Sequence, residues 1–436
     1  MYKTTRFISS FCVFIACGLL ASAGSVLLTP LAAAPSVLFA FIAFILMLVI
    51  GRGTLQGLEP STLQARNVLL IAFGGWFAAE FISTAANNQH WQNLDYPMRF
   101  VMGFATFWII RHIKLIRFEI FFYAIAASAP VAAARASYQY FSLDASRATG
   151  WTNYPIYFGN FCVLMGLYMA IIVVTMRDKI TSPMRVAFSL GIPLLIYSAF
   201  LSGSRSSWLG LLGLLVVIDW RNVKQSRLMA SVLATVISVV IIFMIIPELH
   251  SKLRITEAIH DVHEILEGNF RSSIGDRLQM WKASLLMFWS SPVLGIGSGN
   301  FQVEIANLTL SGAVDIELHQ GSTVYNQAHS EILDILASKG LLGFVAYFVL
   351  LILPFKNFGT YLESTSVSVK TFALMGRATI VAFFMFGLTL ATFKVQIYCA
   401  IYPLTISIFM ALALNLLEGE KNKSKESMRE TANEDG

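Results

Sequence analysis

Long apolar stretches alternate with short polar connections along most of this chain of 436 residues. A helix needs about 20 apolar residues to cross the hydrocarbon layer of a bilayer, and most of the stretches approach that length. The pattern predicts about 12 transmembrane helices, over residues 7–29, 33–50, 67–86, 97–113, 116–136, 154–176, 184–203, 205–220, 228–247, 340–356, 373–393 and 396–417. The first stretch also has features of a signal peptide, because Lys3 and Arg6 precede it. Its apolar run continues past the cleavage-like Ala-Ser-Ala at 21–23, which favours an uncleaved helix.

Composition points to the same class. The chain is 56% hydrophobic and 13% charged, with a mean hydropathy of +0.67, whereas soluble domains carry roughly 25% charged residues. We therefore expect an all-α integral membrane protein whose main solvent is the lipid bilayer. The net charge of +6 is spread over short loops. No single basic patch forms, which argues against a nucleic-acid partner.

The distribution of basic residues predicts the orientation. With the N-terminus inside, the inner connections collect most lysines and arginines, and the short outer loops hold only Arg99, Arg135, Arg147, Arg205 and Lys394. This is the positive-inside pattern, and it places both termini in the cytoplasm. The predicted organisation is nine helices in 1–247, an outward loop of short helices in 248–339, three helices in 340–417, and a disordered cytoplasmic tail in 418–436.

The outward loop contains an amphipathic helix over 274–290, with apolar residues at helical spacing. Arg277 lies on its apolar face, one turn before Trp281. It is either an arginine that extends from an interfacial helix to lipid headgroups or a cation directed into a cavity that holds an anion.

A second short helix is predicted over 326–338, where His329 shares a face with apolar residues while Glu331 and Asp334 point the other way. A histidine on an apolar face is usually a core residue. Here, however, the loop faces an aqueous compartment and the helix leads directly into a span. A histidine at such a position is suited to act as a general base near neutral pH. His319 is a weaker candidate without a helical context.

Arginines also mark the outer ends of the spans. Arg205 lies at a turn before a helix that runs inward, where free N–H groups and a guanidinium together favour an anion; the alternative is a headgroup anchor. Arg147 precedes another span of the same direction, and Arg99 and Arg135 lie near outer ends. Glu80, inside a span, is either a counter-ion to one of these arginines or part of a site.

Two patterns in the sequence suggest a dinucleotide site and a metal site, but neither has the context that such a site requires. Gly295, Gly297 and Gly299 form a G-x-G-x-G run without a preceding strand, so a tight turn between two loop helices is expected rather than a dinucleotide site. Asp315, Glu317 and His319 are close in sequence, but their spacing is not diagnostic of a metal site. We expect neither a metal nor another cofactor.

Three segments together resemble the O-antigen ligase and polymerase superfamily, integral-membrane glycosyltransferases of GT-C type. They are SGSRSSW around Arg205, GDRLQMWKASLLMFWSSPVLGIGSGNF around Arg277, and AHSEILDILASKGLLG around His329. Their order is that of the family, with the long outward loop between the ninth and tenth spans. Elsewhere the resemblance is one of hydropathy alone.

The resemblance implies an O-antigen ligase in the inner membrane of a Gram-negative bacterium, with its site facing the periplasm. Arg205 and Arg277, with Arg147 as an accessory contact, would hold the pyrophosphate of an undecaprenyl pyrophosphate-linked O-antigen. His329 would activate a hydroxyl of lipid A–core. Other accessory candidates are His319, Arg99, Arg135, Glu80 and Trp281.

Alternatives remain open. An O-antigen polymerase or a protein O-oligosaccharyltransferase of the same superfamily would share these motifs. A transporter or lipid flippase would also explain many spans with charges inside them, but it predicts an internal repeat and broken helices at the membrane midplane. The polar residues here gather instead at the outer face.

Overall fold

The computed structural model describes residues 27, 34–50, 59–112, 119–212, 255–267, 270, 272–318, 323 and 325–434, and this part of the chain is helical without a β-strand. The longer elements are α2 (Ala34–Ile50), α3 (Pro60–Ala86), α4 (Asp95–His112), α5 (Glu119–Ser137), α6 (Pro155–Thr175), α7 (Ser182–Leu201), α8 (Arg205–Leu212), α12 (Ile255–Leu266), α13 (Ser273–Ser290), α14 (Phe301–Leu310), α15 (Glu331–Tyr361), α16 (Val367–Gly387) and α17 (Gln396–Glu434). Short helical turns are η2 (Trp91–Leu94), η3 (Tyr138–Ser142) and η5 (Thr392–Lys394).

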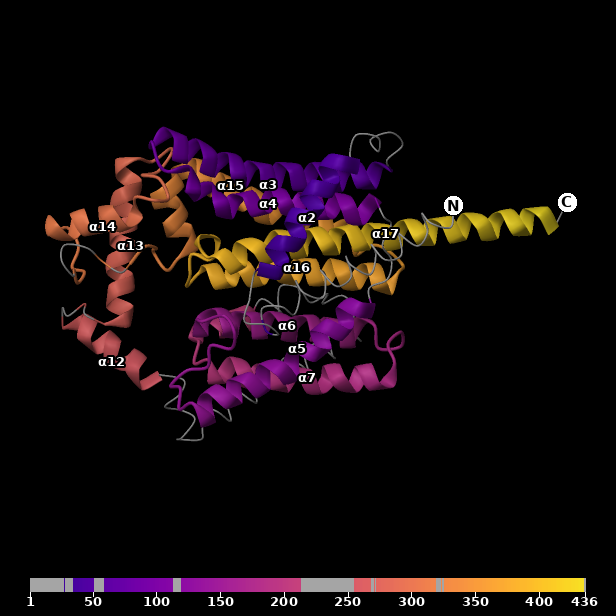
Figure 1. The fold of residues 1–436 in the computed structure, drawn as a ribbon, viewed down its shortest axis with the longest axis horizontal. Helices are drawn as coiled ribbons and strands as arrows, with labels where there is room; N and C mark the ends of the chain where they lie inside the picture. The colour runs from indigo at the N-terminus through magenta and orange to yellow at the C-terminus, as the bar shows by residue number, and fades with distance from the viewer. Residues whose placement is uncertain are drawn as a thin grey trace.

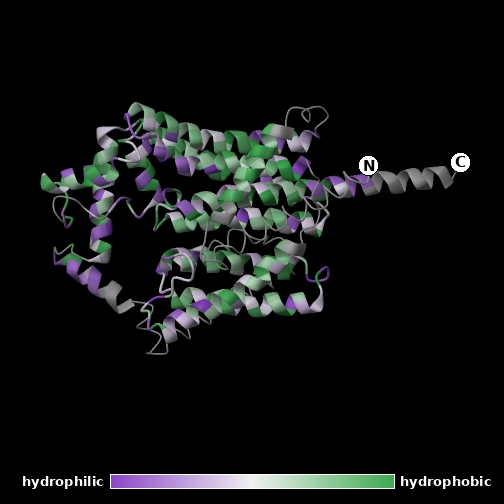
Figure 2. Cartoon of the chain, in the orientation of Figure 1, coloured by the Kyte–Doolittle hydropathy of each residue, from purple (hydrophilic) through white to green (hydrophobic). Residues whose placement is uncertain are grey.

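Six described helices are long and apolar enough to cross a membrane, so the chain is a multi-pass membrane protein; they are α3, α6, α7, α15, α16 and the first part of α17. The span predicted at 228–247, and the span predicted at 7–29 apart from Leu27, fall outside the described residues. Each of the other predicted spans overlaps a described helix. Figure 2 shows the long helices mostly in the hydrophobic colour.

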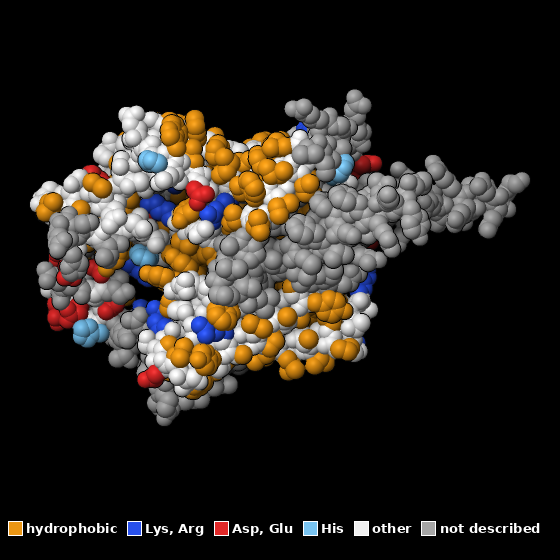
Figure 3. All heavy atoms as spheres, in the orientation of Figure 1, with side chains coloured by type: hydrophobic (Ala, Val, Ile, Leu, Met, Phe, Trp, Pro, Cys, Tyr) orange, Lys and Arg blue, Asp and Glu red, His pale blue; other side chains and the backbone are white. Residues whose placement is uncertain are grey.

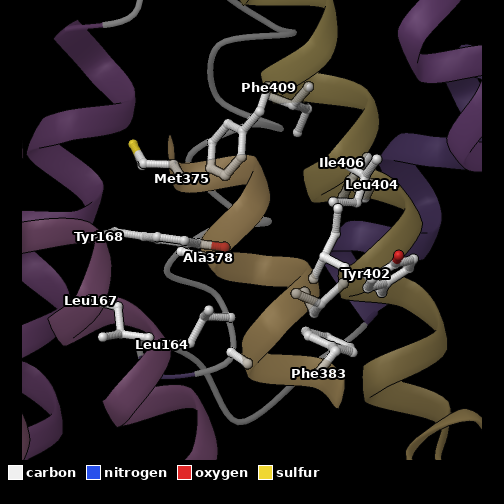
Figure 4. Packing of buried hydrophobic residues seen from close by; sticks show 14 of the residues in the cluster. Leu164, Leu167, Tyr168, Met375, Ala378, Phe383, Tyr402, Leu404, Ile406 and Phe409 are labelled. Atoms are coloured by element: carbon white, nitrogen blue, oxygen red, sulfur yellow. The ribbon is translucent and has the colours of Figure 1, made fainter. Parts of the chain in front are cut away.

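The long helices form a bundle with a continuous apolar core. α17 packs against α4, α15 against α3, and α6 against α7. Figure 4 shows part of this core, where aromatic and aliphatic side chains of α6, α16 and α17 meet. The hydroxyl oxygens of Tyr168 and Thr379 lie 2.6 Å apart, so a polar pair inside the core is mutually satisfied, as an apolar environment requires.

The loop helices α12, α13 and α14 lie together at one end of the bundle, and α13 runs across the direction of the long helices (Figure 1). α17 projects from the opposite end. The tail that the sequence predicted to be disordered is helical as far as Glu434. Its Lys, Glu, Met and Ala residues are good helix formers, and the preceding span supplies the helical turns on which further residues add.

The G-x-G-x-G run forms the expected tight turn between α13 and α14, with positive φ angles at Gly295 and Gly297. This turn packs against α15 where that helix is interrupted at Gly340, whose φ of 59° and ψ of −154° are not helical. The amide of Leu341 donates to the carbonyl of Pro292 (2.8 Å), and that of Ile296 donates to Ala337 (2.9 Å). The backbone groups freed by the break are therefore satisfied by the turn.

The end of α3 completes this junction. Ser83 donates its hydroxyl to the carbonyls of Leu294 (2.9 Å) and Ser338 (3.0 Å). The carboxylate of Glu80 lies 3.0 Å from the Lys339 ammonium, and both side chains are 4% exposed. Glu80 is thus a buried counter-ion to a lysine, whereas the sequence suggested an arginine or a role in the site.

Candidate functional site

A cavity of about 640 Å³ lies between the loop helices and the ends of the long helices. It is lined by Arg147, Ile156, Gly203, Ser204, Arg205, Ser206, Leu209, Ser272, Asp276, Arg277, Met280, Tyr325, His329 and Thr389. Figure 3 shows lysine and arginine side chains gathered around a hollow in this region. The structure therefore brings together four residues predicted from separate segments of the sequence: Arg147, Arg205, Arg277 and His329.

One wall is built from the turn that precedes α8. Arg147 donates from Nε to the carbonyl of Ser202 (2.9 Å) and from Nη2 to that of Gly203 (3.3 Å). Ser207 anchors the first turn of α8 by donating to the side-chain oxygen of Asn160 in α6 (2.9 Å). Arg205 is the first residue of α8, so its guanidinium lies at the positive end of the helix dipole. This wall is suited to an anion.

Arg277 contributes the second cation from α13. The helix begins after Ser272, whose hydroxyl accepts from the Gly275 amide (3.2 Å). Within the described residues, the Arg277 guanidinium has no hydrogen bond or ion pair. Burial, and then the nearby charge of Arg205, lower the pKa of Arg277. Two like charges that face one cavity are costly to bring together, and an anion bound between them would relieve this repulsion.

His329 is held by its neighbours in an uncommon backbone conformation. Its φ is +49°, in the left-handed region that few non-glycine residues occupy. On its N-terminal side, the Ala328 amide donates to Asp334 Oδ1 (3.0 Å) and the Ala328 carbonyl accepts from Trp281 Nε1 (3.1 Å). The predicted helix over 326–338 begins later than expected, at Glu331, so His329 lies in the connection before the helix.

The environment of His329 keeps its imidazole neutral. Burial, and then the charge of Arg277, lower the pKa of His329 to about 4, while Asp334 acts in the opposite direction. Its Nδ1 atom is buried and makes no hydrogen bond within the described part of the chain. A neutral imidazole in a cavity can accept a proton, which a protonated one cannot.

Two carboxylates next to His329 are buried, although the sequence predicted that they point away from its apolar face. Asp334 Oδ1 also accepts from the Lys394 ammonium (3.1 Å), and Lys394 donates to the carbonyl of Asn326 (3.1 Å). Glu331 Oε2 accepts from Thr392 Oγ1 (2.6 Å). The burial is possible because η5, which follows α16, supplies partners for both carboxylates.

The remaining predicted accessory residues do not line the cavity. Arg99 donates to the Gln396 carbonyl (2.7 Å) and pairs with Asp95, and the Arg135 guanidinium lies 4.1 Å from the centre of the Trp151 ring. Trp281 acts on the backbone next to His329 rather than on the cavity itself. His319 lies outside the described residues.

The cavity also contains residues that the sequence did not single out. Asp276 and Tyr325 line it, and the Tyr325 hydroxyl donates to Asp276 Oδ2 (2.6 Å). The sequence offered one indication of Asp276, because it immediately precedes the candidate residue Arg277. Over the ranges that the structure describes, no group of histidine, cysteine and acidic side chains has the arrangement of a metal site.

Comparisons with known proteins agree with the three motifs. Residues 190–348, which include Arg205, Arg277 and His329, match the model of a family described as O-Antigen ligase. The match supports the resemblance to the O-antigen ligase and polymerase superfamily over this segment of the chain. An uncharacterized protein of Haemophilus influenzae is 22% identical over 318 residues, which cover 72% of this chain and 78% of that protein.

Proposed function

We propose that this protein is an O-antigen ligase, which transfers a polysaccharide from undecaprenyl pyrophosphate to a sugar hydroxyl of lipid A–core at the periplasmic face of the inner membrane. The observation that supports this is the convergence of Arg205, Arg277 and His329 on one cavity. These residues come from three separate elements, and two cations beside a neutral imidazole suit the departure of an anion and the removal of a proton.

The arginines would act on the donor. As the bond between the sugar anomeric carbon and the pyrophosphate oxygen breaks, the leaving group gains negative charge. Arg205 and Arg277 would stabilise that charge by planar, charge-assisted hydrogen bonds. Arg147 already donates two hydrogen bonds to the turn before α8, so it would support the donor site mainly by its positive charge and by holding this turn in place.

His329 would act on the acceptor. Its neutral imidazole takes the proton from the acceptor hydroxyl while the hydroxyl oxygen bonds to the anomeric carbon. Attack from the face opposite the leaving group would invert the configuration at that carbon. The reaction needs no nucleotide, because the pyrophosphate linkage supplies the free energy.

The test uses purified protein in lipid nanodiscs with lipid-linked O-antigen and rough lipopolysaccharide. A positioned general base typically contributes 10² to 10⁴ in rate, so His329→Gln should lower kcat by at least about 100-fold. Exposed His263 on α12 offers a matched control, and His263→Gln should keep wild-type activity. Full activity of His329→Gln would exclude the base role.

Donor handling is tested on α13 and α8. Arg277→Gln and Arg205→Gln should each lower kcat/KM for the donor by about 100-fold or more, the usual effect of removing a group that stabilises transition-state charge. Lys282→Gln, at an exposed position of α13, is the control. If both arginine variants keep the donor dependence of the wild type, the phosphate role is wrong.

The choice of acceptor separates ligase from polymerase and from protein glycosylation. Wild-type protein is offered rough lipopolysaccharide, the lipid-linked donor alone, or a pilin-like protein. Product on rough lipopolysaccharide supports the ligase, extension of the lipid-linked chain supports a polymerase, and a modified pilin supports a protein O-oligosaccharyltransferase.

A further inference from the structure

One part of the cavity lining is poorly suited to a pyrophosphate. Asp276, in the first turn of α13, and Tyr325, in the segment before α15, both face the cavity and are joined by a hydrogen bond of 2.6 Å. A carboxylate repels an anionic donor, and the mechanism proposed above uses neither residue. Their presence beside Arg277 and His329 therefore needs another explanation.

The negative charge of Asp276 is not used to neutralise the arginines. Within the described residues Asp276 forms no ion pair, although Arg277 follows it directly in the chain. Its side-chain partner is the Tyr325 hydroxyl. Burial and the hydrogen bond to Asp276 raise the pKa of Tyr325, so this hydroxyl remains protonated and uses its hydrogen on the carboxylate.

This arrangement leaves hydrogen-bond acceptors in the cavity. An ionised carboxylate has two oxygens with about four acceptor positions, and a tyrosine oxygen that has donated its hydrogen can still accept. The Tyr325 hydroxyl occupies one position on Oδ2. A ligand that fits the remaining positions must donate hydrogen bonds without bringing negative charge. Sugar hydroxyl groups have this property, and the tyrosine ring adds an apolar surface on which a sugar ring can pack.

We propose that Asp276 and Tyr325 form the acceptor subsite, which binds a neutral, polyhydroxylated carbohydrate through hydrogen bonds from its hydroxyl groups. This inference rests on the proposed function, since it assigns the second substrate of that reaction. The donor pyrophosphate would lie on Arg205 and Arg277. The acceptor would lie on Asp276 and Tyr325, with one of its hydroxyls directed to His329, which is four residues after Tyr325.

Steady-state kinetics with both substrates varied test the assignment. Hydrogen bonds to charged groups contribute more than neutral ones, so Asp276→Asn should raise the KM for rough lipopolysaccharide by about tenfold. Tyr325→Phe keeps the ring and should raise it by a smaller factor. The donor KM should stay the same or fall, because Asp276→Asn removes a charge that repels the pyrophosphate. Asp315→Asn, at an exposed position of the same loop, should leave both constants unchanged.

A purely structural tie between α13 and the segment before α15 gives a different result. In that case both variants would lower kcat and thermal stability together, with acceptor KM unchanged, and the subsite would be wrong. Tyr325→Phe keeps the assignment testable if Asp276→Asn does not fold, since a normal acceptor KM in a folded Tyr325→Phe protein would also overturn it.

Binding without the donor separates this inference from the proposed function. Core oligosaccharide released from rough lipopolysaccharide is added to the protein in nanodiscs, and saturation-transfer NMR reports contact. Loss of the signal in Asp276→Asn and Tyr325→Phe, but not in Asp315→Asn, supports the subsite. A signal that persists in both variants overturns the subsite while the transfer assay still supports the ligase. Wild-type protein that transfers nothing from the lipid-linked donor overturns the proposed function and the inference with it.

Discussion

Protonation of His329 offers a test of the proposed base that requires no mutation. Burial and the charge of Arg277 lower the pKa of His329 from 6.5 to about 4 in the free protein. At pH 6 an ordinary histidine is mostly protonated, whereas this one is neutral. If the neutral imidazole takes the proton from the hydroxyl of the acceptor substrate, kcat/KM for the donor should stay level as the pH falls from 7 to 5. It should decline near pH 4.

The bound donor changes this value in a predictable direction. A pyrophosphate on Arg277 and Arg205 cancels their repulsion of an imidazolium ion and adds negative charge of its own, so the pKa of His329 rises. A shift of one unit corresponds to about 1.4 kcal/mol. This is the interaction of two unit charges about 12 Å apart at an effective dielectric constant of about 20. His329 and the two arginines line the same cavity, and a shift of at least one unit would place the acid limb of kcat at about pH 5 or higher.

Initial rates between pH 3.5 and 8 in one mixed buffer, at low and at saturating donor, give both profiles, since kcat/KM reports the free enzyme and kcat the complex. Samples held at each pH are returned to pH 7 and assayed again, so that irreversible unfolding is recognised. The residual activity of His329→Gln should lack the acid limb. Two limbs that coincide, or a kcat limb more acidic than that of kcat/KM, would refute the reasoning.

Two further predictions concern the junction at the break in α15. Gly340→Ala should lower the free energy of unfolding by about 2 kcal/mol or more, because φ there is +59° and an added Cβ would lie 2.5 Å from the Val293 carbonyl oxygen. Thermal unfolding measures this loss, and Gly359→Ala, at a position of the same helix with open space for a Cβ, is the control. Equal effects of the two substitutions would contradict the prediction. Lys339→Met should lower the free energy of unfolding by about 3–5 kcal/mol, because the buried Glu80 carboxylate loses its partner. The double variant Glu80→Gln with Lys339→Met should recover part of that loss, and a larger loss in the double variant would show that the unpaired charge is not the cause.

The helical class of the fold was predictable because the main signal is local. Apolar stretches near the length of a span identify helices directly, and Pro292 with the three following glycines identifies the turn. Candidate arginines were likewise visible as charges at the ends of apolar stretches. The conformation at His329 was not visible, because it depends on Asp334 and Lys394, which are 60 residues apart in the chain.

The arginines that line the cavity could be singled out from the sequence, whereas the acidic residue Asp276 could not. Arg205 and Arg277 stand out because a charge next to an apolar stretch is costly and so implies a partner. Asp276 does not stand out, since an acidic residue in the first turn of a helix is common and favourable. Its contact with Tyr325 links residues 49 positions apart, and no local pattern predicts such a contact.

The junction at Gly340 limits how this protein can be divided. Main-chain hydrogen bonds join the turn after α13 to the broken α15, and Ser83 and Glu80 of α3 bind the same place. The segment between α12 and α15 is therefore completed by two spanning helices and should not fold as an isolated water-soluble fragment. A chimera that exchanges this segment between relatives would need to carry the end of α3 and the first turns of α15 with it.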